Sequence, residues 1–329
     1  MKEKITTQVK KIRVSKKAVT IVGAGLVLLS LYYIVSRVVQ DDELIMAFPT
    51  SPAVIAGLVL VSVVIGHGYL FAGVNFRWLM LTLSGFAKAP EKIPFWFGVK
   101  VYVTANLFKY LPGSVMYVLG RNRLSLEIKE ISHIKVALGT ALEGIFVIVA
   151  GLVTVTVIVR RHFVTWLGTL NANVPVLTIA LFLLFVLVIL GLVFRRRMAV
   201  AFRKMVAARG DFSVRSSVRM LAVSFLILAV LGLTFVAVVM LLGQPVTLGM
   251  VPVIAGMYVL AWLAGLLTPG AAGGLGVREL VLFMVLPEVI DPGVAVTAAA
   301  LHRGLCIGGD LCAYGLTAGY SKMKNRERK

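Results

Sequence analysis

The fold is decided by residues 267–279, which read Leu-Thr-Pro-Gly-Ala-Ala-Gly-Gly-Leu-Gly-Val-Arg-Glu. This run places helix-breaking residues and two charges, Arg278 and Glu279, between strongly apolar segments. Irregular backbone at membrane depth is tolerated only where it is buried in protein or lines a cavity. The run therefore predicts a broken helix inside a membrane protein rather than a surface loop.

A second run of the same kind occupies residues 109–121 and reads Lys-Tyr-Leu-Pro-Gly-Ser-Val-Met-Tyr-Val-Leu-Gly-Arg. Here Arg121 follows Pro112 by nine residues, and Arg278 follows Pro269 by the same interval. The matched spacing predicts an internal repeat in which each half of the chain carries one broken helix.

The composition indicates a polytopic membrane protein. Hydrophobic residues make up 59% of the chain and charged residues 15%, whereas soluble proteins have roughly 25% charged residues. The 34 lysines and arginines lie mostly in short runs between apolar segments, as in cytoplasmic loops, so we expect no nucleic-acid partner. The sequence holds no phosphate-binding loop, no zinc-protease or serine-hydrolase motif and no Cys-His cluster. We therefore expect no metal ion or other cofactor.

Six apolar windows approach the length of about 20 residues that a membrane-spanning helix needs. They cover residues 18–39, 53–74, 134–159, 174–194, 218–242 and 293–319. Two further windows, 94–119 and 250–286, contain the Pro-Gly runs. The arm after Arg278 has room for a helix of only about 14 Å, roughly half the hydrocarbon core, before it meets Pro287. Both windows are therefore predicted to be re-entrant helical hairpins.

The positive charges predict the orientation. With two re-entrant hairpins, 27 lysines and arginines face the cytoplasm and 2 face outside. We expect a basic cytoplasmic N-terminus (1–17), one transmembrane domain (18–319) and a basic cytoplasmic tail (320–329). The stretch 18–39 is too long for a signal peptide and is expected to stay as the first span.

The same topology gives each half two spans, one hairpin and one more span in opposite orientations. This pattern predicts inverted repeats, 18–159 and 174–319, whose broken helices meet near the bilayer centre at a substrate site. The predicted fold is thus an all-α polytopic membrane protein with six full spans and two re-entrant hairpins, located in a prokaryotic plasma membrane.

Charged side chains inside apolar segments are costly and usually face a partner or water. Glycines behind a helix-starting proline leave backbone N–H groups that favour anions, and the planar fork of arginine suits phosphate. The predicted substrate-binding residues are Lys109, Pro112, Gly113, Arg121, Gly270, Gly273, Gly274, Arg278 and Glu279. A charge network is predicted from Glu143, Arg303 and Asp310.

The spacing gives two further predictions, an ion pair and a helix-packing surface. A shift of 157 residues carries Pro112 onto Pro269 and Glu143 to position 300, one helical turn from Arg303, so we expect a Glu143–Arg303 ion pair. In the last span Gly304, Gly308, Gly315 and Gly319 form a small-residue stripe, which predicts close helix packing.

The two runs, Lys-Tyr-Leu-Pro-Gly with a later Gly-Arg and Pro-Gly-x-x-Gly-Gly-Leu-Gly-Val-Arg-Glu, resemble the flippase-like transmembrane domain of lysylphosphatidylglycerol synthases and their stand-alone relatives. The resemblance covers nearly the whole chain, and residues 269–279 are its most specific part. The family's Glu-Arg pair in the span after the first run is matched at Glu143 but not at Gly144, and its arginine in the last span is matched at Arg303. The resemblance implies the transport half without the aminoacyl transferase domain.

Three functions remain open. The first is a lipid translocase that moves a phosphate-bearing lipid between leaflets, such as a phospholipid, an aminoacyl-phospholipid or a polyprenyl-phosphate glycolipid. Lipid movement would be either downhill or coupled to an ion. In the second case Glu143, Glu279 or Asp310 would carry a proton. The second is an integral-membrane glycosyl or acyl transferase that acts on a lipid carrier. The third is a non-transporting partner of a glycosyltransferase.

Overall fold

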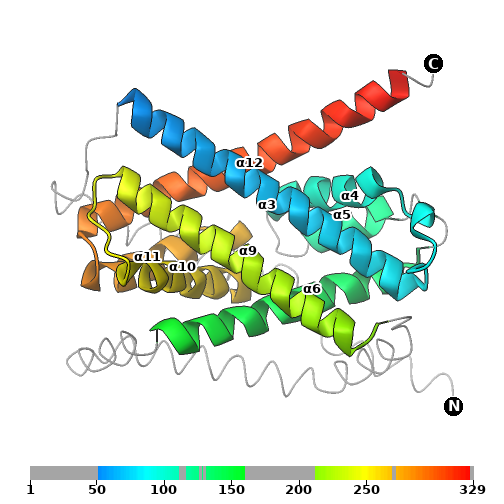
Figure 1. Ribbon diagram of the computed structural model, residues 1–329, viewed down its shortest axis with the longest axis horizontal. Coiled ribbons are helices and arrows are strands. Elements are labelled where there is room, and N and C mark those ends of the chain that lie inside the picture. The colour runs from blue at the N-terminus through cyan, green and yellow to red at the C-terminus, as the bar shows by residue number, and fades with distance from the viewer. Residues whose placement is uncertain are drawn as a thin grey trace, which may run out of the picture.

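The computed structural model describes residues 51–110, 116–125, 128, 131–159, 212–268 and 272–326. Every regular element in these residues is helical (Figure 1). In this part of the chain four helices are long and apolar enough to cross a membrane, namely α3 (Pro52–Ser84), the continuous helix of α6 (His133–Thr154) and η5 (Val155–Val159), α9 (Val214–Leu241) and α10 (Met250–Leu267). The protein is therefore an all-helical integral membrane protein.

The two Pro-Gly windows each form a pair of packed helices. The first pair is α4 (Phe95–Leu107) and α5 (Met116–Ser125), with the short turn η4 (Phe108–Tyr110) at the end of α4. The second is α10 and α11 (Val277–Val285), with the turn η7 (Ala272–Gly274) between them. The remaining elements are η3 (Pro90–Lys92), η8 (Leu286–Glu288) and α12 (Pro292–Arg326).

These bounds confirm helices where four of the six spans were predicted. α3, α6 with η5, and α9 cover the windows near 53–74, 134–159 and 218–242. α12 covers 293–319 but is not among the four helices that reach span-like length and apolarity. The windows 18–39 and 174–194 lie outside the described residues.

Local sequence explains where the long helices begin and end. α3 starts at Pro52, whose ring fixes the backbone angle that the first helical turn needs, and ends at Gly85 in the left-handed conformation (φ 74°). Ser132 precedes α6 and Ser213 precedes α9, and each side chain accepts a hydrogen bond from a backbone N–H of the first turn.

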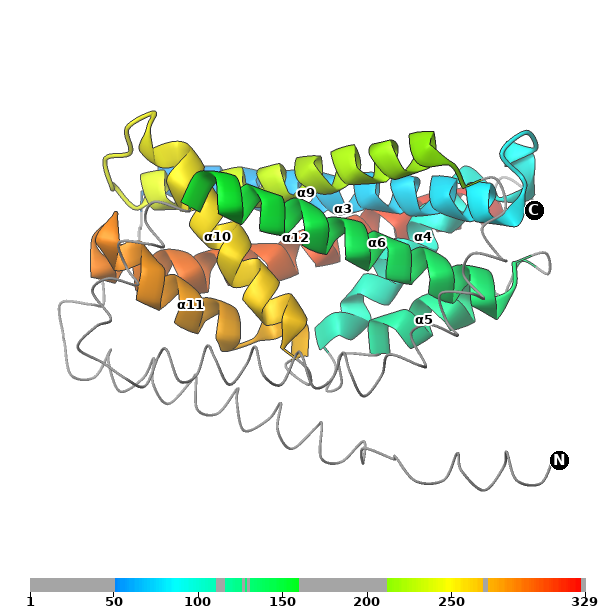
Figure 2. The same ribbon diagram turned by 90° about the horizontal axis from the view of Figure 1, so that it is seen from below.

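Corresponding elements of the two halves run in opposite directions. The colour order in Figure 1 shows α3 running from left to right and α9 from right to left, and it shows α6 and α12 opposed in the same way. The α4–α5 pair and the α10–α11 pair lie at opposite ends of the described helices, and the end of α4 faces the end of α10 in the middle (Figure 2). η4 and η7 are in contact there.

α3 and α12 cross closely at Gly309. A Cβ on Gly309 would lie 2.9 Å from the carbonyl oxygen of Ser62 and 3.0 Å from the backbone nitrogen of Gly66. Nearby, Ser62 Oγ donates a hydrogen bond to the carbonyl of Leu305 (3.0 Å). The predicted glycine stripe was therefore only partly right. A Cβ on Gly308 would meet the Ser62 side chain and one on Gly309 would meet the α3 backbone, but a Cβ on Gly304, Gly315 or Gly319 would have no neighbour within 4 Å.

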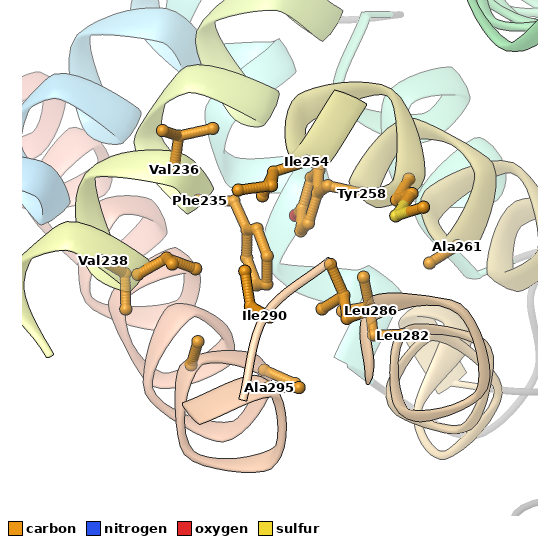
Figure 3. Close-up of a cluster of buried hydrophobic side chains, with 14 of the residues drawn as sticks. Phe235, Val236, Val238, Ile254, Tyr258, Ala261, Leu282, Leu286, Ile290 and Ala295 are labelled. Carbon is orange, nitrogen blue, oxygen red and sulfur yellow. The ribbon is translucent and has the colours of Figure 1, made fainter. Parts of the chain in front are cut away.

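Buried apolar side chains form separate clusters around the two hairpins. One cluster joins α9, α10, α11 and α12 through residues that include Phe235, Ile254, Leu282, Leu286 and Ala295 (Figure 3). Another joins α3, α4 and α6 through Phe76, Leu79, Val99 and Val136. Each hairpin is thus packed against long helices.

Candidate functional site

The two helix breaks meet at Gly273. A Cβ at this position would lie 3.1 Å from Arg303 Nη2 and 3.5 Å from the carbonyl oxygen of Lys109. Gly273, Gly274 and Gly276 all have positive φ (56°, 74° and 79°), a conformation that other residues adopt only with strain. The prediction that residues of the two Pro-Gly runs come together is confirmed for Lys109 and Gly273.

Asp310 ties the first break to the last helix. Its carboxylate is 2% exposed and lies 2.6 Å from Lys109 Nζ. Asn106 Nδ2 donates to Oδ1 at 2.6 Å, and Tyr110 Oη donates to Oδ2 at 2.5 Å. Three donors, all from α4 and η4, therefore occupy both carboxylate oxygens. Buried charge of this kind is stabilised only by such complete hydrogen bonding.

Lys109 is held by aromatic rings as well as by Asp310. Its Nζ lies 4.6 Å from the ring centre of Tyr69 and 5.0 Å from that of Tyr110. It is also 3.5 Å from Tyr69 Oη. The ammonium group is thus surrounded by groups that favour a cation.

Arg121 and Glu143 form a second buried ion pair. Arg121 Nη1 lies 2.5 Å from Glu143 Oε2, and Tyr102 Oη donates to Glu143 Oε1 at 3.0 Å. The guanidinium lies over the rings of Tyr102, Phe76 and Tyr117 at 4.2, 5.2 and 5.4 Å from their centres. Arg121 is 3% exposed. Arg121 is therefore an internal partner of Glu143, which occupies its Nη1.

The predicted Glu143–Arg303 ion pair is wrong. Glu143 is taken by Arg121 and Tyr102, while Arg303 Nη1 donates to the carbonyl oxygen of Gly273 (3.0 Å). The 157-residue shift identifies positions that correspond in the two halves. Correspondence does not imply contact. The packing of α5 against α6 brings Arg121, and not Arg303, to Glu143.

Arg278 is positioned by two glycines. A Cβ on Gly265 would lie 2.5 Å from Arg278 Cγ, and a Cβ on Gly274 would lie 2.8 Å from Arg278 Nε. The guanidinium carbon also lies 5.3 Å from the ring centre of Trp262. The side chain therefore passes through a space that exists only because α10 and η7 carry glycine there.

Three guanidinium nitrogens at the second break are buried without a hydrogen-bond partner among the described residues. They are Arg278 Nε, Arg303 Nε and Arg303 Nη2. One carboxylate oxygen, Glu279 Oε2, is buried in the same unpartnered way. An unmade hydrogen bond at a buried charged group is costly, so these four atoms are candidates for contact with a ligand.

His302 is a packing residue between α9, α10 and α12. Its Nε2 lies 3.1 Å from Thr234 Oγ1, and its Nδ1 lies 3.6 Å from Cys306 Sγ. The rings of Tyr258 and Phe235 meet it edge-on at 4.7 and 5.4 Å. Both ring nitrogens are therefore engaged with other side chains.

The remaining predicted residues have different outcomes. Pro112, Gly113 and Gly270 lie outside the described residues. Among the described residues, no group of three or more His, Cys, Asp or Glu side chains is arranged to hold a metal ion. Sequence reasoning missed the aromatic partners of the cations, above all Tyr69, Tyr102 and Trp262. Their only signal is that they are tyrosine or tryptophan in apolar helices, which is common.

The two arginines that follow Pro-Gly have unequal surroundings. In the 157-residue alignment Arg121 corresponds to Arg278, but Glu143 corresponds to Ala300 and Tyr117 to Gly274. The first arginine therefore has a carboxylate and a ring, and the second has neither at the matching positions. Among the described residues Arg121, Arg278 and Arg303 all have buried guanidinium nitrogens without a partner, but only Arg121 is also paired with a carboxylate.

Comparison of the sequence with protein-family models and with curated proteins found no match. Function is therefore inferred from the chemistry of the site itself.

Proposed function

We propose that the protein is a flippase-like lipid translocase, which moves a phosphate-bearing lipid between the leaflets of a prokaryotic plasma membrane. We also propose that it is related to the transmembrane domain of lysylphosphatidylglycerol synthases, which its two Pro-Gly runs resemble. The observation that carries it is the set of buried guanidinium nitrogens on Arg278 and Arg303 that no described residue satisfies.

These donors lie where the two helix breaks meet. Gly273 touches Arg303 and the backbone of Lys109, and the adjacent Gly274 touches Arg278. Guanidinium groups bind phosphate oxygens through two parallel N–H donors, and a bound phosphate would complete the hydrogen bonds that are missing. A phosphate on a lipid head group would thus sit beside the contact of η4 with η7 while its tails stay in the bilayer.

The topology that suits this activity has six spans, two re-entrant hairpins and inverted repeats. The repeated order of long helix, hairpin and long helix supports it, as does the opposed direction of α3 and α9 and of α6 and α12. The bias of 27 cytoplasmic to 2 external lysines and arginines supports cytoplasmic termini. In such proteins the halves rock against each other around a central site.

The hydrogen bonding refines the choice of proton carrier. Asp310 already accepts from three donors and Glu143 from two. Protonation of either carboxylate would remove an ion pair that holds a helix in place. These two residues are therefore assigned to structure, and the proposal does not depend on proton coupling.

The test is lipid movement by purified protein in liposomes that carry a fluorescent phospholipid. We expect the protein to speed exchange of the lipid between leaflets, and we expect Arg278→Ala and Arg303→Ala to reduce the rate at least tenfold. Arg219→Ala is the matched control, because Arg219 lies exposed over the ring of Trp78 at 4.0 Å and away from both breaks. Full activity of both site variants would overturn the proposed role.

A further inference from the structure

We propose that Tyr110 is a positioning residue for Arg303. Asp310 fixes the Tyr110 hydroxyl, and the Tyr110 ring holds the Arg303 guanidinium near the contact of the two helix breaks without occupying its hydrogen-bond donors. The inference rests on the proposed function and extends it, because it states what orients one of the two arginines that would bind the phosphate.

Tyr110 contacts two charged residues of α12 in different ways. Its Oη donates a hydrogen bond of 2.5 Å to Asp310 Oδ2, and the guanidinium carbon of Arg303 lies over its ring, 5.8 Å from the ring centre. A guanidinium within about 6 Å of a tyrosine ring centre is attracted to the ring. A hydroxyl that donates to a carboxylate increases the electron density of its ring and so strengthens this attraction. Tyr110 therefore links a buried anion to Arg303, although the two charges form no ion pair in the described part of the chain.

The ring contact leaves donors of Arg303 available. Nη1 donates to the carbonyl oxygen of Gly273 at 3.0 Å, while Nε and Nη2 have no partner among the described residues. A carboxylate in place of the ring would accept hydrogen bonds from the guanidinium, as Glu143 does from Arg121. An aromatic face attracts the charge without accepting a conventional hydrogen bond. The ring therefore orients this arginine and keeps donors for a phosphate oxygen.

Tyr110 itself is held where the two breaks meet. Two further side chains of the first half, Asn106 and Lys109, bind the Asp310 carboxylate at 2.6 Å each. The end of α4 and the turn η4 are therefore tied to α12 by three side chains. Since η4 also contacts η7, this tether keeps the Tyr110 ring beside the second break. An arginine of the second half thus depends on the hairpin of the first half for its position.

The corresponding positions of the repeat lack this arrangement. A shift of 157 residues carries the last residue of α3 onto the last residue of α9, so it is the register of the two halves. The same shift carries Tyr110 onto Leu267, and it carries Val153 of α6 onto Asp310. Neither Leu267 nor Val153 has a polar side chain. The Tyr110–Asp310 hydrogen bond is therefore an addition to the repeated fold, made at the candidate site.

The test is a double-mutant cycle on the binding of phosphatidylglycerol to the purified protein, measured by native mass spectrometry. Tyr110→Leu removes the ring, and Arg303→Gln removes the charge but keeps a donor for the carbonyl of Gly273. We expect each change alone to weaken binding at least fivefold, as for the loss of a partly desolvated cation–π contact. The double variant should bind as weakly as Arg303→Gln alone, because Tyr110 acts through Arg303.

Two further variants separate positioning from a general loss of structure. Tyr69→Leu is the matched control, because the Tyr69 ring lies 4.6 Å from Lys109 Nζ and Arg303 lies over the Tyr110 ring instead. Its effect on binding should be the same factor whether or not Arg303 is replaced. Tyr110→Phe keeps the shape of the side chain but loses the hydrogen bond to Asp310. We expect it to weaken binding about threefold, and not at all once Arg303 is replaced.

The possible outcomes distinguish this inference from the proposed function. Equal losses from Tyr110→Leu with and without Arg303, or unchanged binding in both Tyr110 variants, would overturn the positioning role. If Tyr110→Leu does not fold, the same comparison with Tyr110→Phe decides. If no phosphatidylglycerol binds, or if neither Arg303→Gln nor Arg278→Ala weakens binding, the proposed function itself fails. If Arg278→Ala weakens binding but the effects at Tyr110 and Arg303 are independent, only the positioning role is wrong.

Discussion

Arg121 and Glu143 form a buried ion pair in which Nη1 lies 2.5 Å from Oε2. Arg278, which follows its Pro-Gly pair by the same nine residues, forms no ion pair with any residue that the structure describes. The two halves therefore use equivalent arginines differently. The first half pairs its arginine with its own carboxylate, while the Arg278 guanidinium has no carboxylate partner among the described residues.

The first prediction concerns the stability of that pair. Glu143→Ala leaves the Arg121 guanidinium buried without its partner, so we expect it to lower the free energy of unfolding by about 3 kcal/mol. The measurement is thermal unfolding of the detergent-solubilised protein. Exchange of the charges, with Arg121→Glu and Glu143→Arg together, should recover part of the loss.

Glu91→Ala is the control for this experiment, because Glu91 is exposed in η3 and is expected to change stability little. Equal unfolding temperatures for Glu143→Ala and Glu91→Ala would contradict the prediction that the Arg121–Glu143 pair stabilises the fold.

The second prediction compares two glycines of the second half. At Gly274 the φ of 74° disfavours any side chain, and a Cβ would lie 2.9 Å from the backbone Cα of Gly265 and 2.8 Å from Arg278 Nε. We expect Gly274→Ala to cost about 2 kcal/mol in backbone strain and to displace Arg278. Lipid binding should then fall as it does in Arg278→Ala.

Gly304→Ala is the matched change, because nothing lies within 4 Å of a Cβ at Gly304 and the residue is inside α12. Alanine in a helix interior is favoured over glycine, so this variant should keep both stability and binding. Loss of binding in Gly304→Ala, with none in Gly274→Ala, would show that Gly274 does not position Arg278.

Much of the architecture could be predicted from the sequence, because long apolar windows and helix breakers are local signals. The predicted window 134–159 agrees with α6 and η5 almost residue for residue. The conspicuous charges at the breaks also led to the prediction that Lys109, Arg278 and Arg303 are site residues, and the structure brings Lys109 and Arg303 to Gly273. Their partners could not be predicted, since pairing depends on which helix faces meet. Arg121 reaches Glu143 only because α5 folds back toward α6.

The glycines of α12 show the same limit and give the third prediction. Spacing alone singled out Gly315, yet it is at Gly309 that a Cβ would lie 2.9 and 3.0 Å from α3 backbone atoms, because the crossing point depends on helix rotation. We expect Gly309→Ala to force α3 and α12 apart and to cost about 2 kcal/mol, in the range found for overpacking. Gly315→Ala, which meets nothing within 4 Å, should unfold at the temperature of the unchanged protein or above it.

The last prediction tests the orientation of the chain. Leu248 is 93% exposed between α9 and α10, in a loop assigned to the outside, and Lys88 is exposed between α3 and α4, in a loop assigned to the cytoplasm. After Cys306→Ala and Cys312→Ala remove the native thiols, Leu248→Cys should react with a membrane-impermeant maleimide in intact cells. Lys88→Cys should react only after the membrane is opened. The reverse pattern would invert the topology and place the first hairpin's entry on the outer face. Reaction of both positions in intact cells would mean that a segment between the two loops, from α4 to α9, does not cross as assigned, because the two loops must lie on opposite sides if the charge bias sets the topology.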